Sequence, residues 1–289
     1  MISTTFESVH GTGHGIHASV AKITGIDRSF RFSRVRNFLA VLAISFMTPG
    51  SVTAQWIKIQ LPATPRTADG KPNLSAPTPR TADAKPDLSG IWTAVTFEAV
   101  ENLAGKKGEV PMQPWAAAVY KERIESFGRD KPQVRCMPHG VPDAMLVPDY
   151  PFKIIQTPSE TIILGEEFNQ FRQIFTDGRK LPVDPNPAWF GYSVGKWEGD
   201  TFVVESSGFS DDGSWLDNGG HPHTDALNLT ERFRRLNFGT MELDVTVDDH
   251  KAYTKPWKSV TERFKLMPDT ELIENLCDKE TDAVHLKAK

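Results

Sequence analysis

The sequence lacks the short motifs that mark several large enzyme classes. It contains no Gly-x-Gly-x-x-Gly loop, no Walker loop and no His-Glu-x-x-His pair. These absences argue against nicotinamide dehydrogenases, P-loop ATPases and zincin proteases, because each class uses its motif to hold phosphate or zinc. Cysteine is scarce too: the 289 residues include two, and they lack the close spacing of a zinc–thiolate site.

The sequence also lacks an excess of charge of either sign and a long hydrophobic run. It carries 33 basic and 37 acidic residues, a net charge of −4, without a basic stripe, so we expect no nucleic-acid partner. The clearest apolar run, residues 38–46, is far shorter than the ~20 residues that a membrane-spanning helix needs. We therefore expect no stable membrane span in the mature protein.

The residues around that run follow the order of a secretory signal. Arg31, Arg34 and Arg36 precede it, and the small residues 52–54 follow it. We interpret residues 1–54 as an N-terminal extension and signal peptide, which predicts a periplasmic or secreted bacterial protein. An uncleaved N-terminal anchor is the alternative.

The two cysteines, Cys136 and Cys277, form the small even set that is typical of exported proteins with paired thiols. We expect them to form a disulfide that ties an early loop to the end of the domain. In the chain-entropy model such a long-range bridge contributes up to about 5 kcal/mol. Two buried, unpaired thiols are the alternative.

A tandem repeat precedes the part of the chain that can build a core. Residues 64–75 recur, with small changes, as residues 78–89. Both copies are rich in proline and charge and poor in hydrophobic residues, so we interpret residues 55–86 as a disordered linker. We expect residues 87–289 to form a single domain.

Most of this domain is predicted to be strands joined by short turns such as Asp177-Gly178. Eight or more sequential strands usually close into a barrel, because closure removes exposed edges. The predicted fold is mainly β: an antiparallel up-and-down barrel of calycin or lipocalin type, with one or two short helices and long Pro-rich loops. The expected strands are 152–157, 161–168, 171–176, 192–197, 201–209, 227–236, 240–247, 259–266 and 271–276.

One amphipathic helix is expected near residues 112–127. Pro114 suits a first helical turn, and Gly128 suits the end. Apolar side chains recur at three- and four-residue steps, which predicts that they share one face. They are Trp115, Val119, Tyr120, Ile124 and Phe127.

Three strands each place one glutamate on an otherwise apolar side: Glu166, Glu231 and Glu262. A barrel would direct the three toward one interior, where burial raises the pKa of a carboxyl. Such a group suits a general acid or base, or the binding of a cation or ligand. Alternatively, the glutamates lie in solvent, or Arg172, Arg232 or Arg263 neutralises them.

His221, His223 and Asp225 alternate along a predicted extended segment, so all three could face one ion or substrate. This pattern makes them candidates for catalysis and weak candidates for a metal site, since no third histidine follows at a ligand spacing. A surface turn with solvated histidines is the alternative.

A stiff Pro-rich loop carries His139 and Asp143, which could form an acid–base dyad if the loop folds back on itself. A structural loop is the alternative. Several aromatic residues in or beside such loops could wall a pocket mouth and are candidates for ligand binding, although core packing would explain them equally. They are Tyr150, Trp189, Tyr192 and Trp215.

Longer motifs carry a family resemblance. Asp87-Leu-Ser-Gly-Ile-Trp92, Thr176-Asp-Gly-Arg-Lys-Leu-Pro182 and the segment Gly191-Tyr-Ser-Val-Gly-Lys-Trp-Glu-Gly-Asp-Thr-Phe-Val-Val-Glu205 resemble a family of uncharacterised exported proteins common in acidobacteria and proteobacteria. The resemblance covers roughly residues 80–278 and implies no catalytic roles. The opening Gly90-Ile-Trp92 is also similar to that of lipocalin-like barrels.

The leading hypothesis is an exported barrel that binds a small apolar or aromatic molecule, because apolar strand faces and abundant aromatics suit such a ligand. The alternative is a cofactor-independent lyase, isomerase or hydrolase, with Glu166 or Glu231 as base and His139, His221 or His223 as acid or orienting group. A metal-dependent site at His221 and His223 is the third possibility. No cofactor is predicted, and ligand identity and oligomeric state stay open.

Overall fold

A computed structural model describes residues 59–95, 102–105, 109–148, 150–211 and 213–277. Every described residue belongs to one compact unit, which lies within Gln55–Lys289 and excludes residues 1–54. The predicted signal peptide therefore lies outside the described residues. Within the described ranges, no helix is long and apolar enough to cross a membrane.

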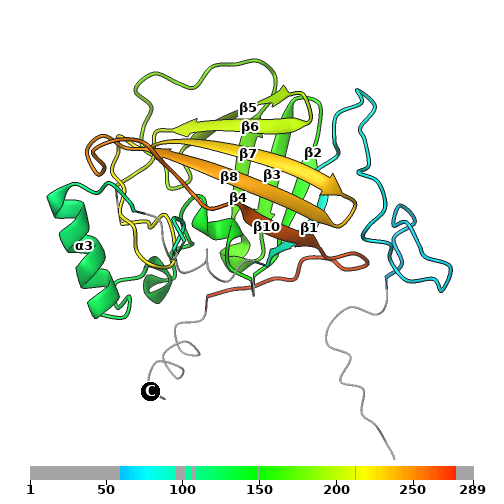
Figure 1. The fold of residues 1–289 in the computed structure, drawn as a ribbon, viewed down its shortest axis with the longest axis horizontal. Helices are drawn as coiled ribbons and strands as arrows, with labels where there is room; N and C mark the ends of the chain where they lie inside the picture. Colours follow the sequence, from blue (N-terminus) through cyan, green and yellow to red (C-terminus); the bar gives the residue numbers. More distant parts are fainter. Residues whose placement is uncertain (1–58, 96–101, 106–108, 149, 212, 278–289) are drawn as a thin grey trace, which may run out of the picture. The chain divides into compact units, whose positions relative to one another are not determined.

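The described strands form one sheet in the order β10-β1-β2-β3-β4-β5-β6-β7-β8-β9. Because β10 also pairs with β8, nine of these strands close into a barrel, and β9 is left as an edge beside β8 (Figure 1). The strands are β1 (Gly90–Ala94), β2 (Phe152–Gln156), β3 (Glu160–Gly165), β4 (Phe171–Phe175), β5 (Tyr192–Glu198), β6 (Thr201–Ser207), β7 (Asn228–Asn237), β8 (Thr240–Asp248), β9 (Trp257–Lys258) and β10 (Glu262–Leu266).

The predicted mainly-β barrel is confirmed, with one departure from an up-and-down order. β4 and β5 run parallel, pairing Ile174 with Ser193, whereas the other neighbouring strands in the described sheet are antiparallel. A parallel pair cannot be joined by a tight turn, and residues 176–191 supply the long connection. The strand predicted at 271–276 is wrong, since these residues lie outside the sheet.

Alternate side chains of the strands fill the barrel interior. On β7, Leu229, Glu231 and Phe233 are at most 1% exposed. Aromatic rings from different strands also meet there: Phe152 and Phe264 lie edge to face with centroids 5.2 Å apart. Because side chains occupy the middle of the barrel, the interior is a packed core and not an open channel.

The predicted helix is α3 (Pro114–Glu125), with Pro114 in its first turn as expected. The predicted apolar face is wrong, because Ile124 is 50% exposed and Phe127, just beyond the helix, is 94% exposed. The helix buries Ala116 instead. Periodicity showed that apolar residues recur, but neighbouring loops decide which side of a helix is covered. Short 3-10 turns follow at η1 (Pro132–Arg135), η2 (Asp143–Met145) and η3 (Glu167–Asn169).

The expectation of a disordered linker is wrong for residues 59–86, which form two matching turns against the barrel. In each copy a threonine backbone N–H donates to a lysine carbonyl four residues on, Thr67 to Lys71 and Thr81 to Lys85, both at 2.9 Å. Backbone bonds also join this segment to the β7–β8 turn, including Phe238 N–H to the Ala76 carbonyl at 2.8 Å. Hydrogen bonds in these turns therefore order the segment, although it buries little apolar surface.

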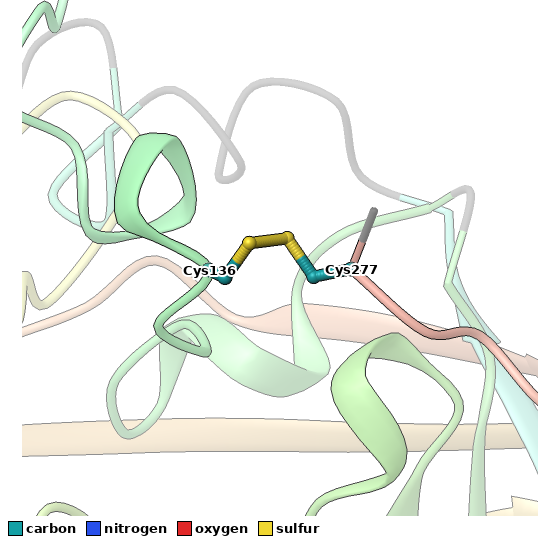
Figure 2. Close-up of a disulfide and its surroundings, with 2 residues drawn as sticks. All are labelled: Cys136 and Cys277. Atoms are coloured by element: carbon teal, nitrogen blue, oxygen red, sulfur yellow. A yellow bond between two sulfur atoms is a disulfide. The ribbon is translucent and has the colours of Figure 1, made fainter. Parts of the chain in front are cut away.

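The predicted disulfide is present. Cys136, at the end of η1, is bonded to Cys277, with the two Cα atoms 5.6 Å apart (Figure 2). The bridge joins residues 141 positions apart in the chain. It therefore fastens the extended segment after β10 to the loops that follow α3.

Different segments cover the two ends of the barrel. We call one the helix end, which carries α3 and the loop segments 126–148, 208–211 and 213–227. We call the other the repeat end, which carries the repeat turns and the β2–β3 turn at 157–159. Figure 1 shows α3 and the cyan segment 59–89 at opposite ends of the strands.

Candidate functional site

A buried ion pair occupies the barrel interior. Arg172 on β4 donates from Nη1 to Glu231 Oε1 on β7 at 3.0 Å, and its Nη2 bonds the second carboxylate oxygen. The same guanidinium reaches Ser193 on β5 at 3.2 Å and Ser206 on β6 at 2.9 Å. Four adjacent strands thus each contribute one polar side chain to a cluster whose members form hydrogen bonds with one another.

The prediction that Glu231 faces the interior is confirmed, since it is 0% exposed. Both of its oxygens accept from Arg172, so it is not a free base. The neutralisation by Arg172 is one of the alternatives that the sequence left open. Residues 191–195 also spell Gly-x-Ser-x-Gly, but Ser193 lies inside strand β5 and contacts Arg172, so this is not a nucleophile elbow.

Glu166 does not share that interior. It follows the end of β3, and its Oε2 accepts from the backbone N–H of Ile273 at 3.2 Å. The expectation that Glu166 shares one interior with Glu231 and Glu262 is therefore wrong. On β3 the deeply buried positions are Thr161 and Ile163, which are opposite in parity to Glu166. A glutamate beyond the last strand residue is not bound by strand alternation.

At the helix end, His139 lies between two carboxylates. Its Nδ1 is 2.6 Å from Asp143 Oδ2, and its Nε2 is 3.2 Å from Glu167 Oε1. Burial disfavours the charged ring, but Asp143 and Glu167 outweigh burial and raise the pKa of His139 to about 10. The expected His139–Asp143 contact is present, but the ring is a buried imidazolium with both nitrogens engaged, and no proton acceptor is left on it.

A second buried pair joins His221 to Asp217, with Nδ1 and Oδ2 2.5 Å apart. Tyr120 of α3 stacks on the imidazole at a centroid distance of 4.3 Å. Asp217 Oδ2 also accepts from the Leu103 N–H at 2.7 Å. A carboxylate that fixes one nitrogen of a histidine is the orienting half of an acid–base pair.

Glu262, at the start of β10, is 1% exposed. Burial, and then the charge of Asp217, raise the pKa of Glu262 to about 8. Its Oε1 has no hydrogen-bond partner within the described residues, and the same holds for the buried Nε1 of Trp257. Two orphaned polar atoms in one region are places where a water or a ligand atom can be held.

His221 and His223 do not converge. His223 Nε2 contacts Ser214 Oγ, whereas His221 contacts Asp217. Asp225 pairs with Lys251 at 2.5 Å on the surface. The expectation of a common face is therefore wrong, and within the described ranges no group of three or more His, Cys, Asp and Glu side chains could hold a metal ion.

The aromatic candidates have separate surroundings. Trp189 Nε1 donates to the His139 carbonyl at 3.4 Å, and Tyr192 Oη donates to the Asn186 carbonyl at 3.0 Å. Trp215 packs under Arg123, whose guanidinium carbon lies 4.6 Å from the ring centroid. Tyr150 is half-buried. None of these four lines the cavity at the repeat end.

That cavity measures about 550 Å³ and lies at the mouth of the barrel. Trp197 of β5, Gln156 of β2 and Thr161 of β3 form its barrel side. Residues 81–83, in the turn of the second repeat, also line it. The remaining lining residues are Thr157, Pro158 and Thr176.

The helix end offers much less interior room. An apolar pocket beside Arg172, lined by Met145, Phe152 and Phe190 among others, measures about 20 Å³. A cavity of that size holds about one water molecule. A drug-sized ligand needs several hundred cubic ångströms, so this pocket cannot accept one without rearrangement.

Several site residues were not among the sequence candidates. Arg172 was considered only as a neutralising partner, and Asp217, Glu167 and Trp197 were not singled out. Asp217 lies four residues before His221 in the same loop, and this spacing could have identified it as a partner of the histidine. Glu167 and Trp197 gave no signal, because their roles depend on strands that meet across the sheet.

No protein-family model and no curated protein matches the sequence.

Proposed function

We propose that this chain is a small-molecule-binding β-barrel whose ligand occupies the repeat-end cavity. The observation that carries this proposal is a cavity of about 550 Å³ at the barrel mouth. That volume lies within the range of natural ligand sites, and barrel mouths are among their usual locations.

The lining indicates the class of ligand. Trp197 offers a flat apolar surface, while Thr81, Thr157 and Thr176 carry hydroxyls that can orient a polar group. Asp83 is the one ionisable side chain of that lining. These groups suit a compact ligand with an aromatic or apolar body and a few hydrogen-bonding groups.

We also infer that the protein works in an oxidising compartment. The disulfide between Cys136 and Cys277 supports this inference, because such bonds persist in exported proteins and are rare in a reducing cytosol. Export to the periplasm or medium, and membership of the exported family described above, belong to the same proposal.

A ligand screen with two matched variants tests the binding site. Ala82→Trp places a large side chain in the cavity lining, whereas Ala68→Trp makes the same change at the matching position of the first repeat, outside that lining. A true ligand raises Tm of the wild-type protein and of Ala68→Trp, because it binds only the folded state. The proposal fails if Ala82→Trp responds as strongly as the wild type.

Acid–base catalysis at the helix end is the second candidate function. Glu262 favours it, because a carboxyl with a raised pKa, an orphaned oxygen and Asp217 nearby resembles a catalytic acid or base. His221, oriented by Asp217, would be its companion. A substrate screen that compares the wild type with Glu262→Gln tests this, and an activity left unchanged by the substitution would exclude Glu262.

A further inference from the structure

Ser214 and His223 form a buried pair in the loop 213–224 at the helix end. Ser214 is 4% and His223 is 9% exposed. His223 Nδ1 lies 3.2 Å from the Thr224 carbonyl, so the proton of a neutral ring belongs on Nδ1. Nε2 is then the acceptor, and the Ser214 hydroxyl donates to it. This is the orientation in which a histidine can take the proton of a serine.

The surroundings hold this pair in place. Burial lowers the pKa of His223, so the ring is the neutral base at pH 7. Asp249, itself 1% exposed, binds Thr224 through the backbone N–H at 2.6 Å and through Oγ1 at 2.9 Å. Gly140 packs so closely that a Cβ there would come within 2.7 Å of the Trp215 carbonyl oxygen.

A cationic cleft of about 450 Å³ adjoins the loop 213–224. Its lining includes Gly213, the residue before Ser214. The charges of Arg123 and Asp211, two other lining residues, act on His223. The full lining is Arg123, Arg129, Asp130, Lys131, Arg135, Asp211 and Gly213. Four cations thus face two carboxylates, an excess that favours an anion.

Neighbouring groups hold Arg123, one of the four cations, in place. Its guanidinium stacks on Trp215, and its Nη1 donates to the Gly220 carbonyl at 3.1 Å. Its buried Nε lacks a hydrogen-bond partner within the described residues, and the nearest paired carboxylate oxygen, on Asp130, is 3.6 Å away. A guanidinium fixed in this way presents a planar positive charge that suits a carboxylate or phosphate.

We propose that Ser214 and His223 are the nucleophile and base of an acyl-transfer site, and that the cleft binds an anionic group of an ester substrate. Ser214 Oγ attacks the ester carbonyl carbon while its proton passes to His223 Nε2. The bond to the leaving alcohol breaks, and His223 returns the proton to that alcohol. Water, deprotonated by His223, then attacks the acyl-serine. The bond to Ser214 Oγ breaks, His223 returns the proton to Oγ, and the acid is released.

This proposal is independent of ligand binding at the repeat end, because the two sites share no lining residue. It is also distinct from the second candidate function, because it uses other side chains than Glu262, Asp217 and His221. Asp249 acts as a positioning residue, since its hydrogen bonds reach the pair through Thr224.

A fluorophosphonate probe tests the nucleophile directly, with the full chain and peptide mapping by mass spectrometry. We expect a covalent adduct on Ser214, loss of that adduct in Ser214→Ala, and labelling at least 100-fold slower in His223→Gln. Ser210→Ala is the matched control, because Ser210 is similarly buried in the preceding segment; it should label as the wild type does. A folded wild-type protein without an adduct at Ser214 would overturn the proposal.

A pair of chromogenic esters tests the cleft. The ratio of kcat/KM for the anionic 4-nitrophenyl hydrogen glutarate to that for neutral 4-nitrophenyl butyrate should exceed one. In Arg135→Gln that ratio should fall about tenfold, since one charge contact contributes roughly that factor. Arg232→Gln, on the outer face of β7, should leave the ratio unchanged. A wild-type ratio near one, or a ratio that Arg135→Gln does not lower, would contradict anion binding.

Discussion

The two ends of the barrel differ in how they combine charge and space. The helix end buries His139, Asp217 and His221 among their partners, yet its interior pocket holds about 20 Å³. The repeat end is lined mainly by hydroxyls, an amide and Trp197, and it encloses about 550 Å³. The buried titratable groups therefore lie away from the repeat-end cavity, and the cationic cleft beside the loop 213–224 belongs to the helix end. The proposed ligand site and the proposed acyl-transfer site lie at different ends of the barrel.

The interior ion pair joins β4 to β7 between these ends, and its loss should have the largest effect. Arg172→Met leaves Glu231 as a lone buried charge, so the free energy of unfolding should fall by about 3–5 kcal/mol. The double variant Arg172→Met/Glu231→Leu should recover most of that loss. Urea unfolding measures both, and a single variant that costs under ~1 kcal/mol would show that the pair is dispensable.

At the helix end, His139→Ala should cost about 3 kcal/mol, because Asp143 and Glu167 lose their shared cation. The sign of the pH effect follows from a pKa of about 10 in the folded protein against about 6.5 unfolded. The stabilisation is full below pH 6.5 and is lost as pH rises to 10.

Unfolding free energies of the wild type at pH 6, 8 and 10 should decline, and the decline should be much smaller in His139→Ala. His250→Ala, which removes an exposed histidine, is the control and should follow the wild type. A wild-type curve that stays flat between pH 6.5 and 10 would contradict the charged ring.

Substitution of Glu262 should have the opposite effect on stability, since it should raise the free energy of unfolding. Its folded pKa of about 8 exceeds an unfolded value of about 4.3, so ionisation costs stability as pH rises from about 4.3 to 8. Glu262→Gln should therefore be more stable than the wild type at pH 8, by on the order of 2 kcal/mol after allowance for partial solvent screening. Melting curves at pH 4.5 and 8 check this, and a loss of stability at pH 8 would refute it.

In the repeat turns at the other end, a change of backbone preference should by itself alter the stability of the protein. These effects should be the smallest of the set. Ala84 has φ 60°, where the matching residue of the first copy is Gly70 at φ 80°. Ala84→Gly relieves the left-handed backbone and should gain up to about 0.5 kcal/mol, while Gly70→Ala should lose about as much. Thermal melting of both variants tests the pair, and shifts in the same direction would count against matched turns.

How much of this architecture could be predicted from sequence depended on the range of each interaction. Alternation along β7 and β10 placed Glu231 and Glu262 inside correctly, because parity is a local property of a strand. Parity failed for Glu166, which lies past the end of β3. Arg172 was not identified as the centre of a cluster, because its partners come from three other strands and one pairing is parallel.

The errors in the loops have a different origin. Low hydrophobic content suggested disorder for the repeat, but Arg66 reaches Asp269 at 2.7 Å and Arg80 reaches Asp200 at 2.6 Å, and internal turn bonds add to these anchors. The helix face was misjudged because α3 turns Tyr120 and Arg123 toward His221 and Trp215. Such contacts depend on the fold of distant loops, which no local pattern encodes.

The most direct test of the central claim is a fluorescence titration with N-phenyl-1-naphthylamine, a neutral aromatic probe that the cationic cleft does not attract. The account predicts saturable one-to-one binding by the wild type and by Ala68→Trp, and at least tenfold weaker binding by Ala82→Trp, whose side chain fills the repeat-end cavity. Equal affinities for all three proteins would contradict a ligand site at that end of the barrel.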